Sequence, residues 1–275
     1  MTSTDLQGTT IPPLKDDDIE TMLAALAGGN RRVQRVVLSD RAVWIKRYMD
    51  RRFAPAHQAL SLIARLGGMP GLRPSPHLDA AGMIERECRQ IDAFRTHGFT
   101  VPEVLYRSRS ALVLSDLGPS VGVQLVAMRQ QDPNGHEALV ERCGLELGRV
   151  HGAGLCHGRP HPRDFALPDG QFGFFDFEED PAAVMPLAMA QARDVWLLLL
   201  DTTTRALSAT TPIATLAAWR RFRPENAEFA LAELVSRLAR LLPVVHLMLR
   251  VRSGRDLERF VRATEFLTSR TLLRS

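Results

Sequence analysis

The chain has 275 residues, enough for one large domain or for two lobes that share a cleft. Hydrophobic residues make up 45%, charged residues 24%, and the formal net charge is +4, as in an ordinary soluble globular protein. Three scattered cysteines exclude a disulfide framework and indicate a reducing compartment. No secretory pattern opens the chain, and no apolar run matches a bilayer span, so we expect a cytoplasmic protein.

The first part of the chain has a β-rich pattern. Residues 1–15 are expected to form a flexible tail, and 16–27 have helical spacing that ends at a Gly-Gly pair. The runs 32–38 and 42–48 flank a short polar turn and predict a β-hairpin. Beyond the hairpin the pattern predicts a short helix over 55–66, a loop over 67–77, a helix over 83–97 and strands over 101–106 and 111–114.

Helical patterns dominate after residue 120. The predicted helices cover 121–129, 136–152, 187–205, 212–221, 225–251 and 256–273. The β-like interruption among them is the segment 157–180. A β-rich first part and a helical second part predict a bilobal α+β fold, with an N-lobe over 16–118 and a C-lobe over 119–275.

The segment 157–180 reads HGRPHPRDFALPDGQFGFFDFEED and carries the strongest functional pattern. Asp164 follows a His-Gly turn, and a short apolar strand ends at Asp176. Two such carboxylates, one on a loop and one at a strand end, can meet at one Mg²⁺ ion. Magnesium favours one or two carboxylates together with phosphate oxygens. The segment therefore predicts a phosphoryl-transfer site.

Lysine is rare in this sequence, which makes its positions informative. Of 35 Lys and Arg residues, the lysines are Lys15 and Lys46. Lys46 lies inside an apolar strand pattern, and ammonium and guanidinium groups are not interchangeable at a tight site. We therefore expect Lys46 to have a specific role, against the alternative of a strand-end lysine that extends into solvent.

Four fragments together resemble a known superfamily. They are V-W-I-K-R-Y at 43–48, E-C-R-Q-I-D-A-F-R-T-H-G-F-T-V-P at 87–102, L-G-R-V-H-G-A-G-L-C-H-G at 147–158 and F-F-D-F-E at 174–178. With these, the chain resembles the protein-kinase-like superfamily over roughly residues 32–200. It is most similar to bacterial lipopolysaccharide kinases of the Kdo/InaA type, with a looser likeness to RIO kinases and aminoglycoside phosphotransferases.

This resemblance implies a bilobal kinase fold that binds ATP and Mg²⁺. Lys46 would contact the α- and β-phosphates, and Glu87, preferred over Glu85, would hold it in place. Asp176 would hold Mg²⁺, and Asp164 would take the place of the family's metal-binding Asn. Asp116, in the linker between the lobes, completes the expected nucleotide-binding set.

The resemblance also implies supporting residues. His151 and His157 are expected to be structural, and Asp194 to support the catalytic loop from a C-lobe helix. The acidic run 178–180 reads as a solvated turn, with help to a second metal ion as the alternative.

Arg159 is the main departure from the family pattern, because it stands where the catalytic Asp is usual. Loss of that Asp would cost about 10²–10⁴-fold in rate if nothing replaced it. Phosphoryl transfer nevertheless depends mainly on positioning and charge neutralisation. Arg159 can neutralise γ-phosphate charge, with His161 or Asp164 handling the proton. No G-x-G-x-x-G precedes Lys46 either.

Three functions stay open from the sequence. The first is an ATP-dependent phosphotransferase of the lipopolysaccharide-kinase-like group, acting on a sugar, lipid or protein. The second is a pseudokinase that binds nucleotide without transfer. The third is a basic adaptor, because the arginines of the last forty residues favour contact with an anionic surface such as the inner membrane, and nucleic acid is disfavoured.

Overall fold

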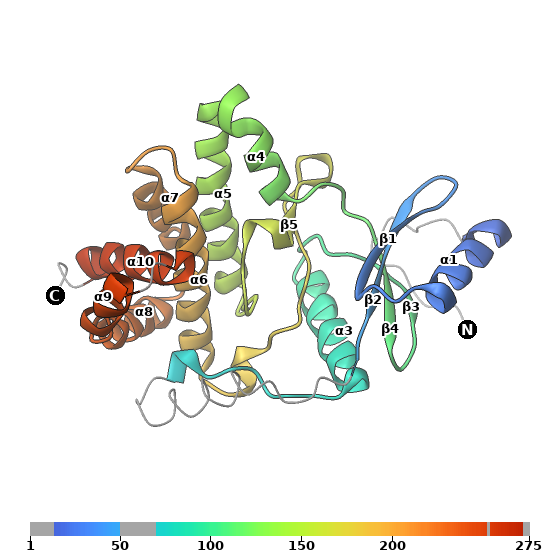
Figure 1. Cartoon of the computed structure of the whole chain (residues 1–275), viewed down its shortest axis with the longest axis horizontal. Coiled ribbons are helices and arrows are strands. Elements are labelled where there is room, and N and C mark those ends of the chain that lie inside the picture. The colour runs from blue at the N-terminus through green and yellow to red at the C-terminus, as the bar shows by residue number, and fades with distance from the viewer. Residues whose placement is uncertain (1–13, 50–69, 252–253, 272–275) are drawn as a thin grey trace.

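The computed structural model describes residues 14–49, 70–251 and 254–271. The helix expected over 55–66 and residues 1–13 of the expected tail lie outside these residues. A small antiparallel sheet with α1 and α3 lies at one end of the molecule, and a larger group of helices lies at the other (Figure 1). The predicted α+β fold, with a β-rich N-terminal part and a helical C-terminal part, is confirmed.

The sheet has four strands in the order β1-β2-β4-β3. Its strands are β1 (Val33–Val37), β2 (Ala42–Arg47), β3 (Val104–Arg107) and β4 (Ala111–Ser115), with α1 (Asp16–Gly28) before them. Side chains alternate between two cores along each strand. Val43 and Ile45 pack with Met22 of α1, whereas Leu112 and Leu114 belong to the core that continues into the helical part.

Helix α3 (Ala80–Thr96) lies on the side of the sheet that faces the helical part. Its N-cap is Asp79, whose carboxylate accepts a hydrogen bond from the Gly82 N–H at 2.8 Å. The helix buries an apolar stripe that includes Ile91 and Phe94, and it ends before Gly98, which has φ +79°.

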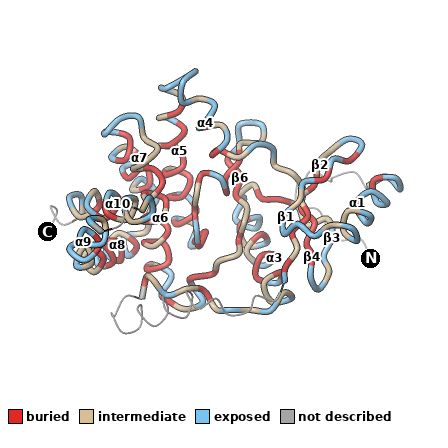
Figure 2. Tube along the Cα trace, in the orientation of Figure 1, coloured by how far each residue is buried: buried red, intermediate tan, exposed pale blue. Residues whose placement is uncertain are grey.

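The second part contains α4 (Val121–Gln131), α5 (Pro133–Gly152), α6 (Leu187–Arg205), α7 (Thr211–Arg220), α8 (Glu225–Ala239), α9 (Leu242–Val251) and α10 (Arg255–Thr271). Helices α5 and α6 contribute more buried residues than any other described helix of this part (Figure 2). Within the described residues, no helix has both the length and the apolar character needed to cross a membrane.

The single helix predicted over 225–251 is wrong, because the chain breaks it into α8 and α9 at residues 240–241. Pro243 explains the break. A proline has no N–H to donate to the carbonyl four residues earlier, and its ring collides with that carbonyl, but it is tolerated in the first turn of a new helix.

A short hairpin lies between α5 and α6 in the sequence. Its strands are β5 (Phe165–Ala166) and β6 (Gly173–Phe174), and the 3₁₀ turn Pro162–Asp164 precedes it. The Phe174 N–H donates to the Thr100 carbonyl at 2.9 Å, which ties the hairpin to the loop after α3. The two ends of the hairpin therefore lie beside the sheet, where they carry Asp164 and Asp176.

Candidate active site

A cleft of about 560 Å³ lies between the sheet and the helical part. Its walls come from β1, β2, the end of β4 with the 115–120 linker, the start of α4 and both ends of the β5–β6 hairpin. Of the predicted site residues, it is lined by Lys46, Asp116, Asp164 and Asp176. This is the size of an ordinary small-ligand site.

Lys46 is the centre of a buried ion-pair cluster. Its Nζ donates to Glu87 Oε1 at 2.7 Å, to Glu87 Oε2 at 2.9 Å and to Asp176 Oδ1 at 2.8 Å. Burial acts to lower the pKa of Lys46, but the Glu87 and Asp176 carboxylates outweigh it and raise that pKa well above its usual range. The cluster joins β2, α3 and the end of the hairpin, so Lys46 stays charged.

On α3, it is Glu87 and not Glu85 that contacts Lys46. Glu87 is fully buried, whereas Glu85 is exposed. The Tyr48 hydroxyl also donates to Glu87 Oε2. Sequence reasoning did not include Tyr48, although its position two residues after Lys46 places both side chains on one face of β2.

Asp176 has a strained backbone. Its φ of +69° lies in the left-handed region, which residues other than Gly rarely adopt. Burial acts to raise the pKa of Asp176, but Lys46 and then Arg159 outweigh it and hold that pKa below its usual value. A strained conformation that the surroundings maintain is common at functional sites.

Asp164 is a buried carboxylate without a protein partner. It is 5% exposed, and its side chain forms no hydrogen bond or ion pair with any residue that the structure describes. Burial, with help from the Asp176 charge, raises the pKa of Asp164 to about 7. A buried carboxyl group whose ionisation is disfavoured by burial and by a neighbouring carboxylate fits a divalent cation held between the two.

The carboxylates alone do not form a closed metal cage. No group of three or more His, Cys, Asp or Glu residues in the described part of the chain is arranged to hold a metal ion. Asp164 and Asp176 therefore fit Mg²⁺ better than a metal that needs a full set of protein ligands, since phosphate oxygens complete the shell of Mg²⁺.

Asp116 braces the linker at the cleft. Its Oδ2 accepts from Arg35 Nε at 2.7 Å, and its Oδ1 accepts from Trp44 Nε1 at 3.0 Å and from the Gly118 N–H at 2.9 Å. Burial acts to raise the pKa of Asp116, but these hydrogen bonds outweigh it and hold that pKa below its usual value. The carboxylate thus positions Arg35 and Trp44, two cleft residues that the sequence did not indicate.

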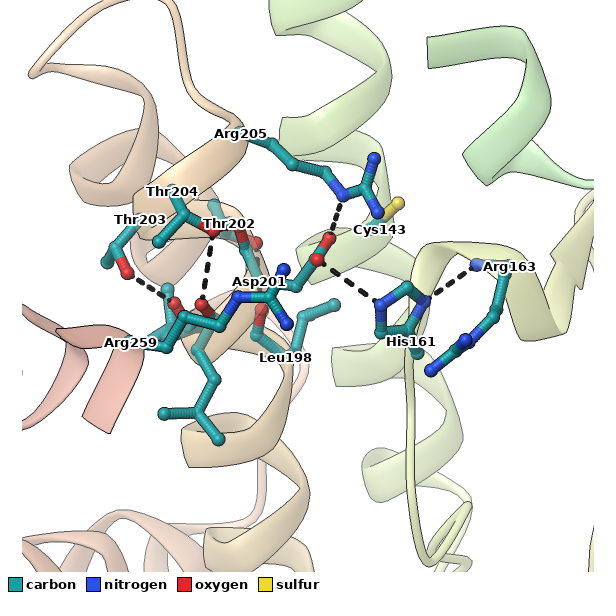
Figure 3. Close-up of polar contacts among 12 residues, drawn as sticks. Cys143, His161, Arg163, Leu198, Asp201, Thr202, Thr203, Thr204, Arg205 and Arg259 are labelled. Atoms are coloured by element: carbon teal, nitrogen blue, oxygen red, sulfur yellow. Dashed lines mark hydrogen bonds and ion pairs between the residues drawn. The ribbon is translucent and has the colours of Figure 1, made fainter. Parts of the chain in front are cut away.

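Arg159 is exposed beside the two carboxylates, and its positive charge acts on the pKa of both. Both ring nitrogens of His161 face protein groups. Its Nδ1 accepts from the Arg163 N–H at 3.0 Å, and its Nε2 lies 3.2 Å from Asp201 Oδ1 (Figure 3). The sequence idea that His161 handles the proton therefore loses support.

Asp194 of α6 holds the loop that carries Arg159. This fully buried carboxylate accepts from the His157 N–H at 2.7 Å and from the Gly158 N–H at 3.0 Å. His151 contacts Asp194 through Nε2 at 3.4 Å and accepts from Trp219 at Nδ1. The chain Trp219–His151–Asp194 therefore fixes the loop from the helical part.

The His157 ring packs in an aromatic cluster. It lies against Phe94, Phe165 and Phe177, with 5.2 Å between the His157 and Phe177 ring centroids. Burial lowers the pKa of His157, so the ring is neutral and acts as a packing group.

The acidic run 178–180 is not a solvated turn. Glu178 pairs with Arg32 and lies 3.4 Å from Lys46 Nζ, and Asp180 pairs with Arg89 at 2.9 Å. The buried Arg86 donates to the Glu178 carbonyl at 2.9 Å. These contacts link the run to the N-terminal part. The sequence did not indicate them, because the partners are far apart along the chain.

The solved structures that resemble this chain include two of low sequence identity. The chain is similar to a Rio2 kinase–ADP/Mg²⁺–phosphoaspartate complex from Chaetomium thermophilum, with 16% identity and a TM-score of 0.39 over 91% of this chain and 75% of that chain. It is also similar to an Rv3197–erythromycin complex from Mycobacterium tuberculosis, with 19% identity and a TM-score of 0.33. That match covers 74% of this chain and 60% of the other. No protein-family profile and no curated sequence matches.

Proposed function

We propose that the protein is an ATP-dependent phosphotransferase with a kinase-like fold. The observation that supports this best is the contact of Lys46 Nζ with both Glu87 and Asp176. It brings an ammonium from the sheet and a carboxylate from the hairpin to one cleft, where a triphosphate needs them. From the sequence resemblance we assign the protein to the lipopolysaccharide-kinase-like group, in the cytoplasm or at the inner membrane surface.

In this proposal the chain positions the phosphates and neutralises their charge. Lys46, held by Glu87, provides a fixed ammonium for the α- and β-phosphates. Asp164 and Asp176 would hold Mg²⁺, which would supply Lewis-acid neutralisation of the transferring group. Arg159 adds positive charge that acts on both carboxylates, and the adenosine would lie beside Trp44 and the 115–118 linker.

A pseudokinase is the second candidate, and Arg159 is the observation that favours it. By the sequence resemblance, Arg159 takes the position of the usual catalytic Asp, and both ring nitrogens of His161 face protein groups, Asp201 and the Arg163 N–H. A protein without a base still binds nucleotide through Lys46 and the two aspartates.

Thermal melting with and without Mg²⁺–ATP tests the nucleotide site, and ATP turnover under the same conditions separates the two candidates. Saturating ligand at a hundred times its dissociation constant stabilises a protein by about 2.7 kcal/mol. We expect Asp176→Asn to lose this stabilisation. Asp169→Asn is the matched control, because Asp169 is exposed at the hairpin tip and also has positive φ.

Each result has one meaning. Stabilisation with turnover that Asp176→Asn abolishes supports the phosphotransferase. Stabilisation without turnover supports the pseudokinase, and Arg159→Asp then tests whether a carboxylate restores transfer. If Mg²⁺–ATP stabilises the wild type no more than Asp176→Asn, neither candidate stands.

A further inference from the structure

A second depression of about 410 Å³ lies beside the cleft. We call it the basic groove and define it by Val123, Val126, His161, Arg163, Arg205 and Arg259. These residues come from α4, the loop before β5, the end of α6 and the start of α10. Val123 and Arg163 also line the cleft, so the two spaces are neighbours.

A buried carboxylate organises one wall of the basic groove (Figure 3). Asp201 is 2% exposed, and it pairs with Arg205 Nε and with His161 Nε2. Arg205 thus turns its Nε toward Asp201, and its terminal nitrogens have no acceptor among the residues that the structure describes. A guanidinium fixed in this way is ready to bind an external anion, with little side-chain entropy left to lose.

Arg163 and Arg259 add positive charge that the protein does not neutralise. Arg163 is exposed and has no ion pair within the described residues. Arg259 lies 3.8 Å from Asp256 Oδ1, but the Asp256 side chain is 98% exposed, so that pair is weak. Three guanidinium groups therefore share the groove with one buried carboxylate, and the excess charge is positive.

The backbone also brings this charge close to the cleft. A Cβ added at Gly122 would lie 3.1 Å from both the nitrogen and the Cα of Arg163, so glycine lets α4 pack directly on the loop that carries Arg163. On the α4 side the groove has an apolar wall, because Val123 and Val126 are 62% and 68% exposed.

We infer that the basic groove binds a phosphate group carried by the acceptor. Guanidinium groups match phosphate oxygens in bidentate geometry, and several of them together suit a dianion. The claim that this phosphate belongs to the acceptor rests on the proposed function, whereas the claim that the groove binds phosphate does not. A soluble phosphomonoester and a phospholipid headgroup share this chemistry, and the experiment separates them.

The test uses the full chain and two probes. Calorimetry measures binding of glucose 6-phosphate, and sedimentation measures binding to phosphatidylcholine vesicles with and without phosphatidylglycerol. The variants are Arg163→Ala and Arg259→Ala. Arg262→Ala is the control, because Arg262 is exposed on the same helix and lines neither the cleft nor the basic groove.

We expect one probe to bind and each groove variant to weaken it at least about tenfold, which is about 1.4 kcal/mol, since the variant loses a hydrogen bond to a charged group. Arg262→Ala should bind as the wild type does. Binding of the sugar phosphate assigns a soluble acceptor, and binding of the anionic vesicles assigns a headgroup. The inference is overturned if neither probe binds, or if Arg262→Ala weakens binding as much as Arg259→Ala.

Melting with Mg²⁺–ATP separates this inference from the proposed function. Arg259 lies outside the cleft, so Arg259→Ala should keep the full nucleotide stabilisation. If the wild type binds the phosphate probe but is not stabilised by Mg²⁺–ATP, the nucleotide site is refuted and the phosphate site is supported. If Mg²⁺–ATP stabilises the wild type but no probe binds through the groove, the nucleotide site is supported and the phosphate site is refuted.

Discussion

At the scale of single residues, the pair Lys46–Glu87 sets both stability and function. Glu87 is fully buried, and its charge is tolerable because Lys46 and Tyr48 are held against it. Removing one member of a buried ion pair is costly because the other charge then remains without compensation. Removing both members in a volume-conserving way costs much less.

We therefore expect Lys46→Met to lower the free energy of unfolding by about 3–5 kcal/mol. The double variant Lys46→Met/Glu87→Gln should recover at least about 2 kcal/mol of this loss, because the neutral amide still pairs with Tyr48 and position 87 no longer holds a fully buried charge. Urea unfolding of the wild type, both single variants and the double variant measures the coupling. Losses that simply add would contradict a coupled buried pair.

The left-handed backbone of Asp176 gives a second residue-scale expectation. Ala at φ +69° is strained, whereas Gly is not. Both Asp176→Gly and Asp176→Ala remove the carboxylate and its bond to Lys46, so the difference between them isolates the backbone. Asp176→Gly should be more stable than Asp176→Ala by about 1 kcal/mol, and neither should be stabilised by Mg²⁺–ATP. An Ala variant as stable as the Gly variant in urea would show that this strain is absent.

At the scale of elements, α6 fixes the loop before the hairpin. Asp194 binds two successive N–H groups of that loop, and Gly158 makes the turn possible. Gly158 has φ +96°, and a Cβ there would lie 2.6 Å from the Glu179 carbonyl oxygen. The loop and the acidic run are thus packed backbone against backbone, which leaves no room for a side chain.

Gly154→Ala measures the cost of a positive φ alone, and Gly158→Ala measures that cost together with the crowding of an added methyl group. Gly154 also has positive φ, at +78°, but nothing lies within 4 Å of an added Cβ. We expect Gly154→Ala to cost about 1 kcal/mol from backbone strain. Gly158→Ala should cost at least about 1 kcal/mol more, because the Glu179 backbone must move. Thermal and urea unfolding measure both, and equal losses would show that the loop accommodates the methyl group.

Local patterns predicted the elements well where residues close in sequence decide the structure. The hairpin of β1 and β2, helix α3 and the hairpin that carries Asp176 follow from periodicity and turn residues. The break between α8 and α9 was missed because the apolar spacing continues across it, although Pro243 marks it. The pairing of the acidic run with Arg32, Arg86 and Arg89 is decided by tertiary packing, which periodicity does not encode.

At the scale of the whole molecule, several connections among the described residues join the β-rich and helical parts. The 115–120 linker, braced by Asp116, is a covalent one. A noncovalent one runs from α3 to the acidic run, through Arg86 and Arg89. Because this noncovalent connection lies beside Lys46, the cleft keeps its geometry only while both parts are held together.

If Arg86 and Arg89 couple the two parts, their removal should make unfolding less cooperative. We expect the double variant Arg86→Ala/Arg89→Ala to broaden or split the calorimetric transition, because the partly buried carbonyls of Pro76 and Glu178 and the Asp180 carboxylate lose their partners. Arg95→Ala is the control. Arg95 lies on the same helix, but it bonds Asp92 and the Pro102 carbonyl, within the N-terminal part. A single sharp transition in the double variant, or equal broadening in Arg95→Ala, would show that the two parts are held together without Arg86 and Arg89.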